Sequence, residues 1–142
     1  MSPESTVNRM IDAVNRHDPE AVGACYAEDA VMHNPLSPDE PLVGREAIIA
    51  FETAISGAFS DFRWEPIEPV IVSGNRAIYQ VTATGTFDGP LPQPDGTALE
   101  PNGKTFSIEV AAVDTINDDG LIAEERPFMD ATAFAMALGL VG

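Results

Sequence analysis

The carboxylates near the end of the chain are the residues whose type and position best fit a chemical role. Leu121 to Asp130 has the pattern of a strand that ends in a carboxylate, and a short apolar segment, Ala131 to Leu140, follows directly. An aspartate at this point has two interpretations. It caps the next helix, since Asp is among the preferred N-cap residues, or it projects into an apolar pocket, where desolvation raises its pKa and suits it to proton transfer. The spacing leaves both roles open for Asp130.

Glu109 and His33 are the next candidates for proton transfer. Glu109 interrupts an otherwise apolar strand over residues 106–113, where an acid is rarely buried without a partner. Either it faces a cavity beside Asp130, or it pairs with Arg126 across the strands or lies on the outer face of the sheet. His33 stands at a strand end, and its side chain is either a proton shuttle or oxyanion donor, or a structural histidine.

Other side chains could bind a substrate without reacting with it. Asn34 and Tyr79 carry an amide and a phenol that can hydrogen-bond a carbonyl group. Arg126 could bind a carboxylate or an enolate, or it forms an ordinary ion pair. Candidates for an apolar cavity wall, which otherwise belong to the core, are Phe51, Ile55, Phe59, Trp64, Phe87, Phe106, Phe128 and Met129.

Three helices are expected in the first part of the chain, where they would help to position these residues. Apolar residues at helical spacing predict the first over about Pro3–Arg16 and the third over Gly44–Ala58. The second is short: it begins after Asp18-Pro19 and presents one apolar face, made of Val22, Cys25 and Tyr26.

Extended segments are expected on both sides of the third helix. A brief strand over residues 30–33 is ended by a loop over residues 34–41, whose three prolines suit a rim or lid. Residues 62–73 are mostly extended, and Pro66 and Pro69 favour an edge strand or a bulge there.

Long strands make up most of the remaining chain. Residues 76–87 are rich in β-forming side chains. Lys104–Asn117 and Leu121–Asp130 are joined by a short acidic turn with glycine, the signature of a hairpin. Helices segregated from antiparallel strands give an α+β fold class, and a curved sheet around the long helix would bury both elements.

Composition excludes several functional classes. The 142 residues suit a single domain over residues 1–142. A net charge of −16 argues against nucleic acid or an anionic membrane as a partner. Two histidines and one cysteine argue against a metal site with His and Cys ligands. The lone cysteine, and first residues without signal-peptide character, lead us to expect a cytoplasmic protein.

Several stretches resemble a known family in the right order along the chain. Residues 26–35, 44–51, 85–91 and 120–130 are similar to the SnoaL-like polyketide cyclases of the nuclear-transport-factor-2-like superfamily, which also contains the ketosteroid isomerases. The resemblance implies a cone-shaped, strongly curved antiparallel or mixed sheet around N-terminal helices, an internal cavity for a small apolar ligand, a homodimer, and no cofactor or metal. It also implies that Asp130 is the general acid/base of a cofactor-free aldol ring closure or isomerisation on an apolar carbonyl compound.

Departures from the family pattern keep other functions open. Phe87 replaces a histidine found in many relatives, and Asn34 stands where ketosteroid isomerases carry a catalytic aspartate. No Arg-x-Asp of the epoxide-hydrolase type occurs around residues 78–81. The two main hypotheses are an acid/base enzyme and a non-catalytic module that binds a small ligand. Two weaker ones are an epoxide-hydrolase-like enzyme and a purely structural dimerisation domain whose cavity is filled by side chains. One scaffold of this kind hosts many functions.

Overall fold

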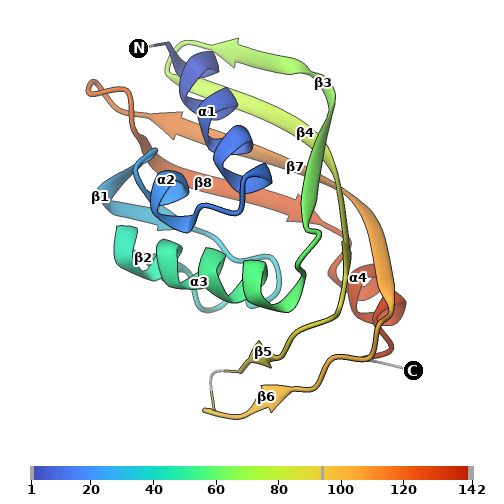
Figure 1. Ribbon diagram of the computed structural model, residues 1–142. Helices are drawn as coiled ribbons and strands as arrows, with labels where there is room; N and C mark the ends of the chain where they lie inside the picture. Colours follow the sequence, from blue (N-terminus) through green and yellow to red (C-terminus); the bar gives the residue numbers. More distant parts are fainter. Residues whose placement is uncertain (1, 94, 141–142) are drawn as a thin grey trace.

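A strongly bent mixed sheet wraps around the N-terminal helices in the computed structural model, which describes residues 2–93 and 95–140 (Figure 1). Its strand order is β2-β1-β8-β7-β4-β3. The strands are β1 (Tyr26–Met32), β2 (Leu42–Val43), β3 (Arg63–Ser73), β4 (Arg76–Thr86), β7 (Thr105–Ile116) and β8 (Ile122–Met129). The helices are α1 (Pro3–Asn15), α2 (Pro19–Gly23), α3 (Arg45–Ala58) and α4 (Ala131–Ala137).

This architecture confirms the predicted α+β cone, and the sheet does not close into a barrel. Two short strands, β5 (Leu91–Pro92) and β6 (Ala98–Leu99), form a separate hairpin inside the long loop between β4 and β7. No helix in the described residues is both long and apolar enough to cross a membrane.

The first helix forms as its sequence predicts. The Ser2 side chain accepts a hydrogen bond from the Ser5 amide, and Pro3 occupies the first turn, where its missing N–H costs nothing. The apolar stripe predicted from its spacing is buried against the sheet and comprises Val7, Met10, Ile11 and Val14.

The prediction that Cys25 and Tyr26 belong to the second helix is wrong. The helix ends at Gly23, and Tyr26 begins β1, which is longer than the brief strand predicted at residues 30–33. The cause is pairing with the last strand, since the Cys25 carbonyl accepts from the Ile122 amide at 2.8 Å. A distant strand thus overrides the local helical pattern.

The predicted C-terminal hairpin is confirmed. β7 and β8 pair antiparallel, and Asn117 stabilises the turn between them by accepting hydrogen bonds from two backbone amides, those of Asp119 and Leu121. β8 pairs on its other side with β1 in parallel orientation, which makes the sheet mixed. The last strand therefore lies near the centre of the sheet.

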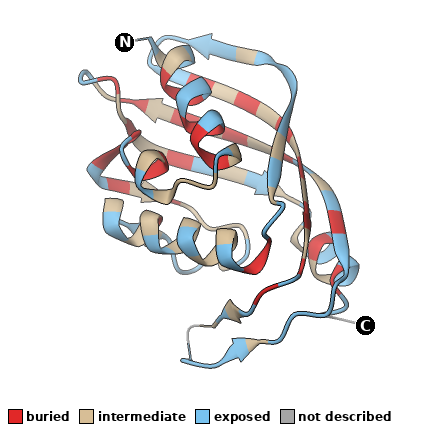
Figure 2. Ribbon diagram, viewed as in Figure 1, coloured by how far each residue is buried: buried red, intermediate tan, exposed pale blue. Residues whose placement is uncertain are grey.

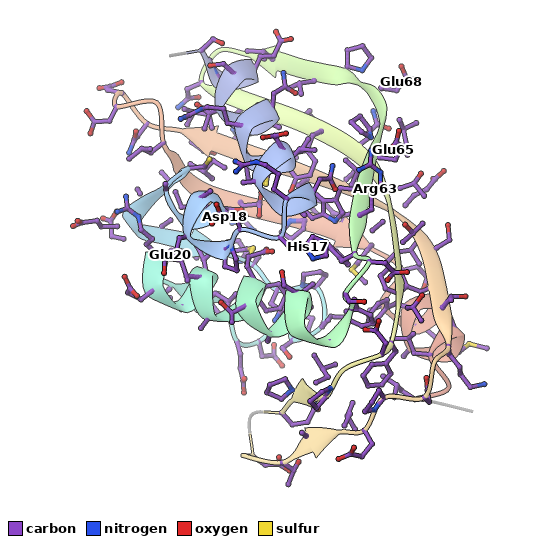
Figure 3. The ribbon with its side chains drawn as sticks, in the orientation of Figure 1. His17, Asp18, Glu20, Arg63, Glu65 and Glu68 are labelled. Atoms are coloured by element: carbon purple, nitrogen blue, oxygen red, sulfur yellow. The ribbon has the colours of Figure 1, made fainter. Side chains whose placement is uncertain are left out.

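β3 is an edge strand with two irregularities in its pairing to β4, on either side of Glu68, as the prolines predicted. Figure 3 shows Arg63, Glu65 and Glu68 on this strand. His17, in the turn between α1 and α2, lies beside the start of β3, where its Nε2 is 2.7 Å from the Phe62 carbonyl oxygen.

Burial alternates along the central strands with a period of two (Figure 2). Every second residue of β4 and β7 faces the helices and is buried, apart from the half-buried Ile108, and the intervening residues face outward. On these two strands the buried residues are Ala77, Tyr79, Val81, Ala83, Gly85, Phe106, Val110, Ala112, Asp114 and Ile116. Asp114 and, on β8, Glu125 are acids within this buried set.

Candidate functional site

A cavity of about 100 Å³ lies between the inner face of the sheet, α3 and the loop after β1. Its walls are mostly apolar and aromatic. The lining residues are Met32, Asn34, Pro35, Leu36, Phe51, Glu52, Ile55, Phe62, Trp64, Tyr79, Ala83, Phe106, Ile108, Val110, Glu125, Pro127, Met129 and Phe134. Among these described residues, Glu52 and Glu125 carry the only carboxyl groups, so they are the natural centre of any proton chemistry.

Glu125 is held by two tyrosines. Its side chain is 2% exposed. The Tyr26 hydroxyl donates to Oε1 at 2.7 Å, and the Tyr79 hydroxyl donates to Oε2 at 2.9 Å. Burial and the nearby Glu125 carboxylate raise the pKa of both phenols well above the usual value, so the tyrosines remain donors. One carboxylate is therefore fixed at the cavity wall by charge-assisted hydrogen bonds.

Asp114 lies opposite Glu125 on the neighbouring strand and is fully buried. Burial, followed by repulsion from Glu125 and a hydrogen bond to it, raises the pKa of Asp114 well above its usual range. As an ionised group, Asp114 has no hydrogen-bond donor for either oxygen among the described residues. A proton on Asp114 removes this deficit, because the acid then donates to the Glu125 carboxylate. Asp114 therefore favours its protonated form in the folded protein.

Glu52 approaches the cavity from α3 and differs from Glu125 in having no partner. Among the described residues it makes no hydrogen bond or ion pair, and it is half-buried and lines the cavity. Desolvation, with a smaller contribution from Glu125, raises the pKa of Glu52 from its ordinary 4.5 to about 8. Such a carboxyl is present in both protonation states near neutral pH, which suits a general acid or base.

The predicted rim at residues 34–41 is confirmed by Asn34 and Leu36. Both line the cavity, and Leu36 is also 41% exposed. The Asn34 Oδ1 accepts from the Leu36 amide at 2.9 Å, which fixes the loop and leaves the Asn34 amide nitrogen as a donor for a ligand.

Several predicted binding residues do line the cavity. They are Asn34, Phe51, Ile55, Tyr79 and Phe106, together with the wall candidates Trp64 and Met129. Phe59 and Phe87 are fully buried behind the wall rather than within it. Phe59 supports the wall by packing edge-on against Phe106, with ring centroids 5.2 Å apart.

Asp130 is the N-cap of α4. Its carboxylate accepts a hydrogen bond from the Ala133 amide at 2.9 Å, and the residue is exposed. The helix-cap interpretation is thus confirmed. Nothing in this geometry connects Asp130 to the cavity, because it is not among the lining residues.

Four other predicted site residues lie outside the cavity. Glu109 is exposed on the outer face of β7, and Phe128 is 60% exposed on β8. Arg126 pairs with Glu124 at 3.2 Å, and His33 Nε2 lies 3.0 Å from the same carboxylate. The positions of Glu109, Arg126 and Phe128 follow from strand alternation, since the even-numbered residues of β7 and the odd-numbered residues of β8 line the cavity. Cavity roles for these residues are not supported.

Glu52, Glu125, Asp114 and Tyr26 were not among the site residues predicted from the sequence. A signal for Asp114 was present, because it continues the alternation of Val110, Ala112 and Ile116. The same alternation on β8 puts Glu125 on the side of Pro127 and Met129. Glu52 gave no signal, since an acid beside an apolar helical stripe usually faces water.

No cluster of three or more His, Cys, Asp or Glu side chains suited to a metal ion occurs in the described part of the chain. Of the carboxyl groups here, Glu125 accepts hydrogen bonds from two phenols and lies opposite Asp114.

Residues 7–125 match the family model described as a SnoaL-like domain. Comparison with curated proteins gives no match. Similar solved structures include a candidate SnoaL-like polyketide cyclase from Jannaschia sp. CCS1, with 23% identity, a TM-score of 0.79, and coverage of 99% of this chain and 93% of that one.

Two further structures resemble the chain at similar coverage. IdmH, a candidate polyketide cyclase from Streptomyces antibioticus, is 23% identical with a TM-score of 0.77. The matched region covers 98% of this chain and 99% of the IdmH chain. A protein of ketosteroid-isomerase-like fold from Catenulispora acidiphila, in complex with trimethylamine, is 16% identical with a TM-score of 0.77. The matched region covers 99% of this chain and 96% of that protein. At these identities the likeness establishes the fold.

Proposed function

The chain belongs to the SnoaL-like domain family, and from this premise we propose that it is a cofactor-free acid/base enzyme acting on a small apolar carbonyl compound. In this proposal Glu52 is the residue that takes and returns the proton. The observation that carries it is an unpartnered carboxyl, with a pKa raised to about 8, on the wall of an apolar cavity.

Glu125 has a different task because both its oxygens already accept hydrogen bonds from Tyr26 and Tyr79. With both oxygens occupied by donors, Glu125 is less free than the unpartnered Glu52 to take a proton from a substrate. Its charge contributes to the raised pKa of Glu52, so it tunes Glu52 towards the range in which an acid/base residue works near neutral pH. In this scheme Glu125 is a positioning residue.

The reaction begins when the Glu52 carboxylate removes a proton from the carbon next to the substrate carbonyl. The electrons of the C–H bond form an enolate, and the amide of Asn34 at the rim donates a hydrogen bond to its oxygen. In an isomerisation, Glu52 returns the proton to a different carbon. In an aldol ring closure, the enolate carbon attacks a second carbonyl of the same molecule, and Glu52 protonates the new alkoxide.

Proton exchange tests this proposal without knowledge of the natural substrate. Cyclopentanone in D₂O would be followed by proton NMR, since loss of the signal next to the carbonyl reports enolisation. We expect exchange above the buffer rate with the native protein, and a fall of about 100-fold or more in Glu52→Gln. Glu46→Gln, on the exposed side of the same helix, is the matched control and should exchange like the native protein. Equal exchange in both variants would exclude Glu52 as the proton carrier.

A second candidate is a module that binds a small ligand without transforming it. The relative from Catenulispora acidiphila was solved in complex with trimethylamine, a molecule with no carbonyl group, which favours this alternative. Saturable binding in the cavity, with cyclopentanone exchange at the buffer rate, would support it over the enzyme.

A further inference from the structure

We propose that the cavity accepts a compact organic cation, an alkylated ammonium group whose charge lies beside Glu52 and Glu125 and whose alkyl groups contact the aromatic walls. This inference rests on the proposed function for the reaction and deepens it by naming the substrate class. The substrates would be small carbonyl compounds that also carry such a nitrogen.

The charge of the cavity is unbalanced. Its lining contains two glutamates, whereas no Lys, Arg or His is found among the described lining residues. Tyr26 and Tyr79 donate hydrogen bonds to Glu125, but as neutral phenols they do not balance its charge. Since a buried carboxylate without a counter-charge is costly, a cationic ligand would gain from interactions that the protein alone leaves unmade.

Glu52 defines where the positive charge of the ligand would lie in the cavity. Glu52 lines the cavity, is half-buried, and has no hydrogen-bond or ion-pair partner among the described residues. Behind Glu125, the fully buried Asp114 likewise has no donor other than a shared proton. A positive ligand group beside Glu52 and Glu125 would supply the partner that Glu52 lacks and an opposite charge for Glu125, whose oxygens accept only from neutral phenols.

The walls select the kind of cation. Six aromatic side chains line the cavity, namely Phe51, Phe62, Trp64, Tyr79, Phe106 and Phe134. Trp64 and Tyr79 lie close together, with ring centroids 5.5 Å apart. Aromatic faces attract alkylated ammonium groups, whose methyl groups also tolerate an apolar wall. A hydrated metal ion would find few oxygen ligands here, and an anion would be repelled.

Size and access agree with a compact ligand. An apolar cavity of roughly 150 Å³ holds benzene, so a cavity of about 100 Å³ suits a group of a few carbon atoms. The rim at Asn34 and Leu36 gives the route from solvent. The net charge of −16 favours the approach of cations over anions.

Cation binding would also help the proposed reaction. A positive charge beside Glu52 favours its ionised form, so the substrate would generate the base that acts on it. The titratable groups that face Glu52 or its neighbour are Glu125, Tyr26, Tyr79 and Asp114. Of these only Glu52 has a pKa raised to about 8, so affinity for a cation should rise between pH 6 and pH 9.

The test compares tetramethylammonium chloride with tert-butyl alcohol, a neutral molecule of similar size, by titration followed through the fluorescence of Trp64. Trp64 is the only tryptophan of the chain and lines the cavity. We expect the cation to bind at least about tenfold more tightly than the alcohol, with affinity increasing from pH 6 to pH 9. Sodium chloride at equal ionic strength should leave the signal unchanged.

Two variants test whether the Glu52 carboxyl holds the cation. Glu52→Gln should weaken tetramethylammonium binding by about tenfold or more and leave the alcohol unaffected, while Glu46→Gln should bind both like the native protein. Calorimetry of the native protein gives a second readout, because cation binding should release protons at pH 7. Equal affinity for the two probes, or native cation affinity in Glu52→Gln, would overturn the inference.

The two proposals fail separately in these experiments. Tight cation binding with cyclopentanone exchange at the buffer rate would remove the enzymatic proposal and keep the cation site. Glu52-dependent exchange, with no preference for tetramethylammonium, would keep the enzyme and remove the cation site.

Discussion

Asp114 and Glu125 face each other directly across β7 and β8, and both carboxyl groups are buried in the core beneath the helices. Two buried acids at such a position cannot both ionise without a large cost. The raised pKa of Asp114 gives the proton to that residue, while the two tyrosines hold Glu125 as an acceptor. The site is therefore a network whose parts depend on one another.

Asp114→Asn should be well tolerated, because an amide supplies permanently the donor that protonated Asp114 supplies. We expect a free energy of unfolding at pH 8 within about 1 kcal/mol of the native value or above it. Asp114→Ala should lower it by about 2 kcal/mol, since Glu125 loses a donor and a small void is left. Urea denaturation at pH 8 measures both. Equal losses in the two variants would show that no proton is shared.

Tyr79→Phe should leave one oxygen of Glu125 buried without a donor. A hydrogen bond to a charged group contributes about 1.5–3 kcal/mol, and we expect a loss of that size in the free energy of unfolding. Tyr26→Phe should behave similarly at the other oxygen. Because both act on one carboxylate, the double variant should depart from additivity by more than about 0.5 kcal/mol. Additive losses would mean that the two hydrogen bonds act independently.

Stability should fall as the pH rises from 5 to 8. The pKa of Glu52 is about 8 in the folded protein, against an ordinary 4.5, so between these values the unfolded chain binds fewer protons than the folded one. The free energy of unfolding then decreases with pH, by up to about 1.4 kcal/mol per pH unit for one such group. Asp114 acts in the same direction, starting above its ordinary 3.8.

Glu52→Gln should flatten this dependence, whereas Glu46→Gln should retain it. Thermal unfolding at a series of pH values measures the slope. If the slopes of the native protein and Glu52→Gln coincide, the Glu52 carboxyl is ionised in the folded state throughout this range.

Asp130→Asn separates the helix cap from acid/base chemistry. Asn caps a helix about as well as Asp, so this variant should keep native stability and native cyclopentanone exchange. Asp130→Ala should lose about 1 kcal/mol of stability, because the Ala133 amide loses its acceptor. Loss of exchange in a fully folded Asp130→Asn would instead restore the role expected from the family resemblance.

The homodimer implied by the family resemblance stays a prediction. The outer face of the sheet and its edge expose several large apolar side chains, among them Ile71, Val72 and Phe128, which suit a subunit interface. Light scattering should give the mass of a dimer for the native protein, and Phe128→Glu should shift it towards a monomer. A native protein that is monomeric at about 100 μM would contradict the prediction.

Local patterns predicted much of the fold because they report on local forces. The stripe in α1, the turn before β8 and the prolines of β3 each produced the expected element. Tyr26 was assigned to a helix because its partner strand lies about a hundred residues away. Pairing at that distance leaves no trace in a short window of sequence.

The site was only partly predictable for the same reason. Asn34 and Tyr79 were found from their chemistry, and both line the cavity. Glu109 and Phe128 were misplaced because the parity of each strand, which decides the face that a residue occupies, depends on the register with its neighbours. The Glu52 carboxyl and its raised pKa arise from tertiary enclosure, which no spacing along the helix reveals.

The parallel pairing of β1 with β8 also sets the order in which this protein can assemble during synthesis. Tyr26 leaves the ribosome early, but its hydroxyl can form its hydrogen bond only after Glu125, 99 positions later, has been synthesised. Until β8 is synthesised, β1 and β7 each have an unpaired edge, and the Tyr26 hydroxyl has no carboxylate to bind. Contacts so distant in sequence slow folding and expose unpaired strand edges. A nascent chain truncated before residue 122 should therefore keep unpaired strand edges exposed and bind chaperones.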